Sequence, residues 1–260
     1  MLTKLTVDFE ITEEMNASVR WGSLFHGIMM KELPAAIASR LHDQSQDQST
    51  RPYSHYVEPV DSRTLRWHIG IWDKNITPVI TQTVMGLSSV ELTGRNIVLQ
   101  VHNATRESIS KEEYIGNFYS AARAERCFDL IYKSPSTHKR AGSYVAFPDI
   151  NLIYDNLSSR FLAFTQTPGM DNKDAIAQLS EHTRIVRHAI RSAPYGVEGI
   201  TILGYMGFLR VMLFGPDAII RLGGLLLSLA EYMGVGIKTA MGMGGCQVIA
   251  VQPKNNLEME

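Results

Sequence analysis

The order of hydrophobic patterns along the chain constrains its fold more than any other feature. Apolar and polar residues alternate over residues 5–11, which is typical of a strand covered on one face. Apolar residues at helical spacing follow over residues 18–32, and Pro34 then ends or kinks that helix before a short helical stretch at 34–41. We expect the first half to continue with strands at residues 54–60 and 64–72. A helix at 77–87, with Thr77 as N-cap and Pro78 in its first turn, and a fourth strand at 97–101 then complete it.

The second half of the chain repeats this order. Residues 184–191 fit either a helix or a strand, and we favour the strand, which places Val186, His188 and Ile190 on one face. The other expected elements are a strand, a helix, a strand, a helix and a strand, at residues 127–133, 151–164, 201–213, 216–233 and 247–251. Two βαββαβ units predict an α+β protein of two tandem ferredoxin-like domains, at residues 1–122 and 123–260.

The composition indicates a globular chain that lies outside membranes. Hydrophobic residues make up 45% and charged residues 20%, so the chain can bury enough apolar surface to fold. Cys127 and Cys246 have no second Cys or His at zinc spacing, so we expect no disulfide framework, no metal site and a cytoplasmic location. The N-terminus lacks a signal-peptide pattern, and the apolar stretch at residues 219–236 is interrupted by Arg221 and Glu231. A net charge of −1 means that a nucleic-acid partner must be argued from local clusters.

A glycine-rich segment, GVGIKTAMGMGG, occupies residues 234–245. It differs from a nucleotide-hydrolase phosphate loop because Ile237 precedes Lys238, and from the dinucleotide fingerprint because it follows a helix and lacks a glycine at Thr239. Its backbone N–H groups could approach a polyanion, with charge from Lys238 and a hydroxyl from Thr239. A tight turn that requires positive φ angles is an equally good interpretation. The candidate phosphate-binding residues are therefore Gly236, Lys238, Thr239, Gly242 and Gly244.

His26 and His42 are candidates for proton transfer. Two imidazoles can serve as base and acid in RNA transesterification, where one removes the 2′-OH proton and the other protonates the leaving 5′-oxygen. A straight helix would separate them by about 24 Å, so they could share a site only because Pro34 breaks the helix. The chain has eight histidines, and a surface or core role is the alternative for either one.

Basic residues form two further local clusters. Arg187 and Arg191, together with Lys238, could make a strip for phosphates, or the arginines could simply lie on a solvated strand face. The segment RPYSHY at residues 51–56 combines Arg51 with two aromatic residues that could stack on bases, and packing in a hairpin explains it equally well. The sequence contains no HExxH or GxSxG motif, so the hydrolase classes built on those motifs have no support.

The strand GYMG at residues 204–207, the apolar helix after it and GVGIKTAMGMG at residues 234–244 form a specific combination. In this order they resemble the signature of the CRISPR precursor-RNA-processing endoribonucleases of the RAMP superfamily, whose loop has the form GxGxKTxxGMG. The resemblance extends over nearly the whole chain, through FDLIYKSPSTHK, SYVAFPDINLIYDNLSSRF, LFHGIMMKELPAAIASRLHDQ and RPYS.

This resemblance implies two ferredoxin-like domains that bind the repeat of precursor CRISPR RNA and cut it without a metal or cofactor, leaving 5′-hydroxyl and 2′,3′-cyclic phosphate ends. The family's catalytic histidine falls on His42, and its upstream partner, often tyrosine in relatives, falls near His26. A lysine that some relatives place after the histidine has no counterpart at residues 43–50. The charged phosphorane would then need another cation, for which the candidates are Arg20, Lys31 and Arg51.

Two other functions remain open at this stage. The same superfamily also supplies subunits that bind crRNA without cutting it, as parts of an effector complex. A ferredoxin-like enzyme that holds a nucleotide phosphate in the glycine-rich segment is a further alternative, and a homodimer is possible for any of them.

Overall fold

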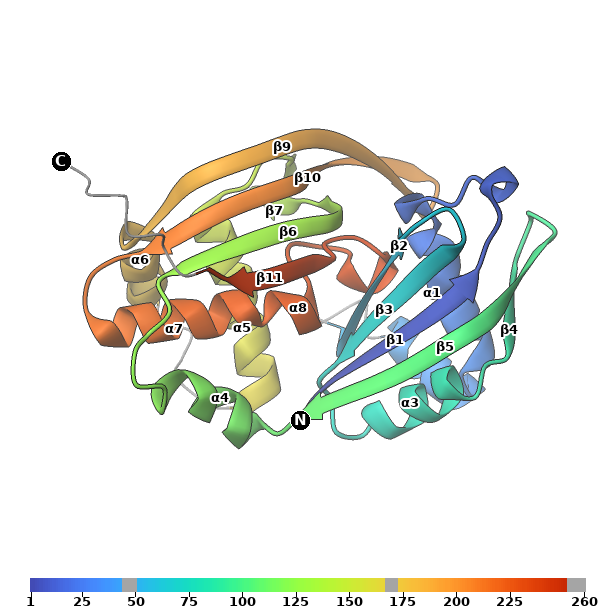
Figure 1. The fold of residues 1–260 in the computed structure, drawn as a ribbon, viewed down its shortest axis with the longest axis horizontal. Coiled ribbons are helices and arrows are strands. Elements are labelled where there is room, and N and C mark those ends of the chain that lie inside the picture. The colour runs from blue at the N-terminus through green and yellow to red at the C-terminus, as the bar shows by residue number, and fades with distance from the viewer. Residues whose placement is uncertain (44–50, 167–172, 252–260) are drawn as a thin grey trace.

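Two antiparallel sheets, each with helices on one face, lie side by side in the molecule (Figure 1). The structure is a computed structural model that describes residues 1–43, 51–166 and 173–251, and for Glu13, His42 and Asp43 it describes only the backbone. None of the helices within these ranges is both long and apolar enough to cross a bilayer.

The first sheet has the strand order β2-β3-β1-β5-β4. Its strands are β1 (Leu2–Glu10), β2 (Tyr53–Pro59), β3 (Thr64–Ile71), β4 (Ser89–Leu92) and β5 (Ile97–Ile109). Its helices are α1 (Gly22–Glu32), α2 (Ala35–Asp43) and α3 (Thr77–Met85), and the 3-10 turns η1 (Glu13–Met15) and η2 (Val19–Trp21) precede α1. Without the added β4, this is the order of a ferredoxin-like unit, as the sequence predicts.

The alternation in β1 places its apolar side chains in the first core, where Phe9 and Trp67 both meet the ring of Phe25 edge-on. Leu33, directly before Pro34, takes an extended conformation and ends α1, and α2 begins immediately after the proline. The predicted break between the two helices is therefore confirmed.

The start of α3 differs from the prediction. Thr77 is the first helical residue and not the N-cap, which is Ile76. The Asp73 carboxylate accepts hydrogen bonds from the amides of Asn75 (2.8 Å) and Ile76 (3.0 Å), while the Thr77 hydroxyl donates to the Asp73 carbonyl oxygen (2.6 Å). Asp73 thus stabilises the turn that leads into α3 by accepting hydrogen bonds from amides that precede the helix.

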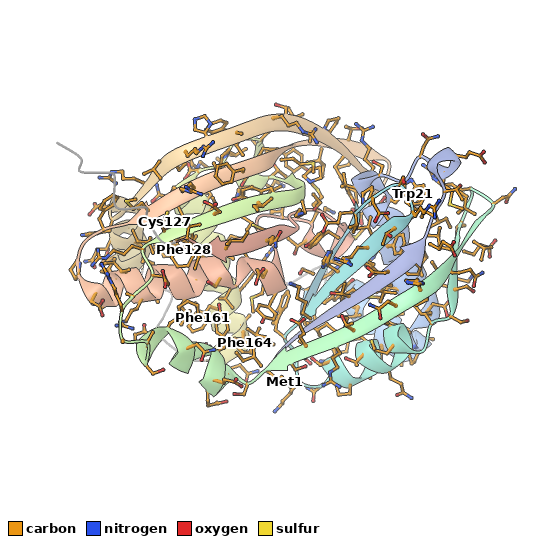
Figure 2. All side chains as sticks on the ribbon, viewed as in Figure 1. Met1, Trp21, Cys127, Phe128, Phe161 and Phe164 are labelled. Carbon is orange, nitrogen blue, oxygen red and sulfur yellow. The ribbon has the colours of Figure 1, made fainter. Side chains whose placement is uncertain are left out.

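The second sheet has the order β11-β6-β10-β9, again that of a ferredoxin-like unit. Its strands are β6 (Cys127–Ser136), β9 (Thr183–Val197), β10 (Ile200–Leu213) and β11 (Cys246–Ala250). Its helices are α5 (Ile150–Thr165), α6 (Lys173–Glu181), α7 (Asp217–Ser228) and α8 (Ala230–Met233), and η3 (Thr239–Met241) lies in the glycine-rich segment. The core between this sheet and its helices includes Phe128, Phe161 and Phe164 (Figure 2).

The strand interpretation of residues 184–191 is confirmed, since they lie within β9. β9 and β10 form a long hairpin that turns at Glu198 and Gly199, whose φ angles of 51° and 76° are typical of a type I′ turn. β9 has no other strand neighbour in its sheet, so the exposed side chains along it lie at the edge of the second unit.

Four features were not predicted, namely β4, α6, a small hairpin of β7 (His138–Arg140) and β8 (Ser143–Val145), and the connecting helix α4 (Lys111–Tyr119). The Ser110 hydroxyl caps α4 by accepting a hydrogen bond from the amide of Glu113 (3.0 Å). The Tyr114 hydroxyl donates to the carbonyl oxygen of Leu225 in α7 (2.7 Å), so α4 packs against the second unit.

Candidate active site

Strand β2 joins the two units. The Ser54 hydroxyl donates to the carbonyl oxygen of Tyr232 (2.7 Å), and Nε2 of His55 lies 3.0 Å from the carbonyl oxygen of Ala240. Tyr53 is fully buried and Tyr56 is 8% exposed. The two aromatic rings of the RPYSHY segment are therefore packing residues, as the alternative interpretation of that segment has it, and they do not form a surface on which bases could stack.

His26 lies on α1, half-buried, beside two rings of β2. Its imidazole is almost parallel to that of His55, with the ring centroids 6.2 Å apart and an angle of 7° between the planes. The Tyr53 hydroxyl lies 3.2 Å from Nδ1 of His26. Because Tyr53 and His55 are two residues apart on one strand, both point to the side where α1 packs.

His55 is a neutral structural imidazole that the sequence analysis did not single out. Trp67 Nε1–H donates to Nδ1 of His55 (3.2 Å), so the ring hydrogen is on Nε2, which donates to Ala240. Burial lowers the pKa of His55 to about 3, and the nearby His26 adds to this shift. An imidazole with this pKa is neutral at pH 7, so it cannot act as a general acid there.

His42 lies in the last turn of α2, and its side chain is outside the described part of the chain. Residues 44–50, where a relative's lysine would follow, are also outside it. The role of His42 therefore continues to rest on the resemblance in sequence.

Arg51 is the candidate cation that reaches this site. Its Nη1 donates to the Met241 sulfur in η3 (3.4 Å), and its charge acts on the neighbouring Tyr53 hydroxyl. Arg20 and Lys31 are both exposed. Of the three cations considered for phosphorane stabilisation, Arg51 is thus the one that contacts both Tyr53 of the first unit and Met241 of the second unit.

Glu198, at the tip of the β9–β10 hairpin, also approaches the site and was missed by the sequence analysis. Its carboxylate is 2.5 Å from Nζ of Lys238. This hydrogen bond lowers the pKa of Glu198, and the charges of Arg51 and His26 contribute in the same direction. The carboxylate therefore links the basic groups of the first unit to the lysine of the glycine-rich segment.

The glycine-rich segment uses many of its amides within the protein. The amide of Gly236 donates to Asn156 Oδ1 (2.9 Å), and that of Gly244 donates to the carbonyl oxygen of Pro135 (2.8 Å). A Cβ at Gly242 would lie 2.7 Å from Cα of Gly22, at the start of α1, and the φ angle of Gly242 is +94°. This geometry favours the turn interpretation of the glycines, because they allow backbone segments to approach each other closely.

Thr239 and Lys238 differ in their environment. Thr239 is 7% exposed, and its hydroxyl faces the guanidinium of Arg160 (3.2 Å). Lys238 is half-buried and adopts a left-handed conformation with φ of 57°, which turns its side chain toward Glu198. Of the five candidate residues in this segment, only Lys238 has a charged group, and that group reaches Glu198, which lies near Arg51 and His26.

Arg160, on α5, holds the segment in place. Its guanidinium donates to the carbonyl oxygens of Met233, Gly234 (2.7 Å) and Gly236 (2.6 Å), in addition to its contact with Thr239. It is only 3% exposed, and burial lowers its pKa to about 9, so it remains charged at neutral pH. The one signal in the sequence is an arginine directly before Phe161 in a largely apolar helix.

Arg187 and Arg191 lie exposed along β9, opposite Arg210 and Met206 of β10. Both point to the same side of the sheet as Tyr195, further along the strand, whose hydroxyl donates to the carbonyl oxygen of Met241 (2.8 Å). The two arginines therefore form a strip that leads toward the glycine-rich segment.

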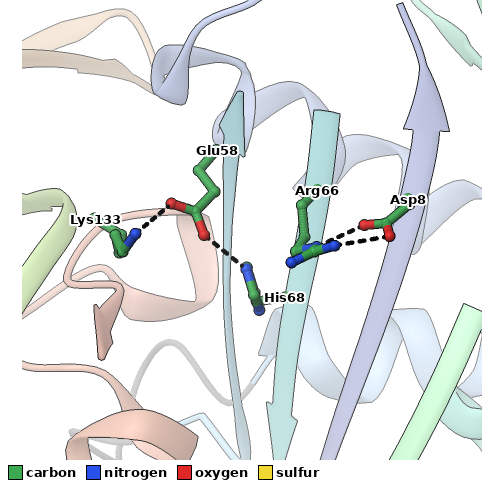
Figure 3. Close-up of polar contacts among 5 residues, drawn as sticks. All are labelled: Asp8, Glu58, Arg66, His68 and Lys133. Carbon is green, nitrogen blue, oxygen red and sulfur yellow. Dashed lines mark hydrogen bonds and ion pairs between the residues drawn. The ribbon is translucent and has the colours of Figure 1, made fainter. Parts of the chain in front are cut away.

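A second polar region lies in a cleft of about 560 Å³ between the open face of the first sheet and β6 (Figure 3). Here Glu58 contacts both Lys133 and His68 at 3.0 Å, and Arg66 forms a two-contact ion pair with Asp8 (2.6 and 2.9 Å). Because cations and carboxylates are matched in pairs, this cleft offers less net attraction to a polyanion than the strip on β9. No group of three His, Cys, Asp or Glu side chains in the described ranges is placed to hold a metal ion.

Comparison with known proteins extends these observations. A family model described as CRISPR-associated endoribonuclease Cas6 matches residues 130–246. The Cas6 endoribonuclease of Mycobacterium tuberculosis is 26% identical over 262 residues, covering 97% of this chain and 80% of that protein. The Cas6 endoribonuclease of Streptococcus thermophilus is 25% identical over 224 residues, covering 86% and 89%.

The fold is also similar to that of solved Cas6 structures. A Cas6 product complex from Thermus thermophilus superimposes with a TM-score of 0.73 and 17% identity, covering 96% of this chain and 100% of that chain. The tandem ferredoxin-like units of this chain thus have the fold of the solved Cas6 structures. Together with the family match and the two relatives, this fold makes the chain similar in sequence and in structure to the CRISPR-associated Cas6 endoribonucleases.

Proposed function

We propose that this chain cleaves precursor CRISPR RNA within its repeats, without a metal ion, by attack of a 2′-hydroxyl on the adjacent phosphate. The observation that carries the proposal is the position of His26, where α1, β2 and the hairpin tip meet. The charged groups of Arg51, Lys238 and Glu198 lie in the same cluster, so an imidazole and two cations are available beside one another.

In the proposed reaction, His26 and His42 exchange protons with the RNA. One imidazole accepts the 2′-OH proton as the O2′–P bond forms, and the other donates a proton to the 5′-oxygen as the P–O5′ bond breaks. The products are a 2′,3′-cyclic phosphate and a 5′-hydroxyl. Arg51 is the group that we assign to the charge on the phosphorane, because it has the contacts described above.

The RNA backbone is proposed to follow the exposed arginines of β9 toward Lys238. Arg187, Arg191 and Lys238 would position the strand without reading its sequence. Gly236, Gly242, Gly244 and Thr239 shape the loop that presents Lys238, since their own atoms pack within the protein.

The test is cleavage of labelled repeat RNA in EDTA under single-turnover conditions. His42→Ala and His26→Ala should each lower the rate by at least about 10²-fold, with RNA affinity nearly intact. His102→Ala, which removes an exposed imidazole on β5, is the matched control and should cleave normally.

Normal rates in both site variants would overturn the catalytic assignment. Strong binding by the unaltered protein without any product, in EDTA or with added Mg²⁺, would instead identify a crRNA-binding subunit that does not cut.

A further inference from the structure

The hydroxyl of Tyr53 is placed to control one nitrogen of the His26 imidazole. Its oxygen is 3.2 Å from Nδ1, and the Tyr53 ring is fully buried, so its position is set by the surrounding core. Burial raises the pKa of Tyr53 to about 12 against the opposing charge of Arg51. The group is therefore a neutral hydroxyl at neutral pH, able to donate or accept one hydrogen bond to the imidazole.

The His55 ring lies next to the rings of His26 and Tyr53, nearly parallel to both. Its plane is within 7° of that of His26 and within 16° of that of Tyr53. Because its two nitrogens are already engaged by Trp67 and Ala240, its ring cannot turn without breaking both hydrogen bonds. The rings of Tyr53 and His55 thus fix the orientation of His26 from β2.

A histidine that exchanges a proton with a substrate must keep a hydrogen on its other nitrogen. A neutral imidazole with its hydrogen on Nε2 has Nδ1 as its basic atom, whereas one with its hydrogen on Nδ1 has a basic Nε2. Since Tyr53 occupies the Nδ1 side of His26, exchange with RNA requires that Nδ1–H donates to the Tyr53 oxygen and that Nε2 carries the transferred proton.

We propose that Tyr53 is a positioning residue that holds His26 in the Nδ1–H form, so that Nε2 is the atom that exchanges a proton with RNA. This inference rests on the proposed function only for the identity of the substrate. The arrangement of the rings and the tautomer of His26 are properties of the free protein.

The experiment combines nitrogen NMR of histidine-labelled protein with single-turnover cleavage. Unaltered protein should show His26 with its hydrogen on Nδ1. Tyr53→Phe keeps the buried ring and removes the hydroxyl, so the Nδ1–H population should fall and the pH profile of cleavage should shift. The rate at saturating RNA should drop about 10- to 100-fold, as expected for one hydrogen bond to a charged group, with RNA affinity within about twofold of normal.

Tyr56→Phe is the matched control. It removes a hydroxyl from the same strand, but its ring stacks on His68, with centroids 4.4 Å apart, and not on His26. This variant should leave both the His26 tautomer and the cleavage rate unchanged.

Two results would overturn the proposal: a His26 hydrogen on Nε2 in the unaltered protein, or a Tyr53→Phe variant with normal tautomer and rate. The first measurement needs no variant, so it decides even if Tyr53→Phe does not fold. Full activity of His26→Ala would reject the catalytic role of His26 but not the tautomer, so the two failures are distinguishable.

Discussion

Nε2 of His55 donates a hydrogen bond to the carbonyl oxygen of Ala240 across 3.0 Å, which ties a strand of the first unit to the loop of the second. The opposite nitrogen accepts from Trp67, so the ring can satisfy both partners only in its neutral form. Protonation of this buried ring would break the contact with Trp67 and leave a charge without a partner. The junction that positions His26 is therefore sensitive to pH.

We predict that the protein loses stability as the pH falls below about 6.5. The pKa values of His55 and His138 are lowered to about 3 and about 4, in both cases mainly by burial. Between those values and 6.5 the unfolded chain binds protons that the folded chain does not, so stability rises with pH in this window. Each group contributes about 1.4 kcal/mol per pH unit there, and its full contribution is present above pH 6.5.

Urea unfolding at pH 7, 6 and 5 checks this prediction. His138→Asn should reduce the pH dependence by about 1.4 kcal/mol per unit. His102→Asn changes an exposed imidazole and should leave the slope as it is. If the unfolding free energy changes with pH equally in the unaltered protein, His138→Asn and His102→Asn, His138 is not buried in its neutral form.

Replacement of Arg160 by methionine should destabilise the glycine-rich segment. The carbonyl oxygens of Gly234 and Gly236 would lose their donor inside the protein, at a cost of about 1–3 kcal/mol for each unpaired group. Arg160→Lys should recover little, because an ammonium cannot reproduce the planar fork. Urea unfolding measures the loss, and Arg123→Met, at an exposed position, should stay within about 0.5 kcal/mol of the unaltered protein. A normal midpoint for Arg160→Met would contradict the assigned role.

Gly242→Ala separates the two interpretations of the glycine-rich segment. If the glycine serves close packing, the added Cβ meets the backbone of Gly22, and the positive φ angle adds about 1–2 kcal/mol of strain. Thermal unfolding should then show a clear loss of stability even without RNA. The matched substitution Gly116→Ala, in α4 with open space around it, should stabilise by up to about 1 kcal/mol. A stable Gly242→Ala with weakened RNA binding would instead support direct approach of RNA to this glycine.

The sequence was sufficient to predict most of the fold because the relevant signals are local. Alternation identified β1, and Pro34 identified the break between α1 and α2. Helix α4 was missed because its charged start was interpreted as a connecting segment, although Tyr114, Ile115 and Phe118 stand at helical spacing. The Ser110 cap and the contact with α7 stabilise it. Such tertiary contacts leave little trace in periodicity.

The candidate site was only partly predictable for the same reason. His26 was proposed from its chemistry and from the resemblance. His55 and Ala240, however, are 185 residues apart, and no spacing rule connects them. Arg160 and Glu198 act through contacts with the glycine-rich segment that form only when parts of the second unit far apart in the sequence have folded together. The sequence left the function of the glycines open, and their buried amides now favour close packing.

The arginines of β9 provide the last prediction, which concerns RNA affinity. Arg187 and Arg191 are exposed, so replacing either with alanine should change stability by less than about 0.5 kcal/mol. If each contacts a phosphate, each substitution should lower the slope of log affinity against log salt by about 0.7 to 0.9, because fewer counterions are released. The cleavage rate at saturating RNA should stay normal, since neither residue is assigned to proton transfer. Titration of labelled repeat RNA at several salt concentrations measures the slope, with Arg63→Ala, at an exposed position near the β2–β3 turn, as the control. An unchanged slope in both β9 variants would mean that the RNA follows another path to His26, and the paired charges in the cleft beside Glu58 would then have to be tested in the same way.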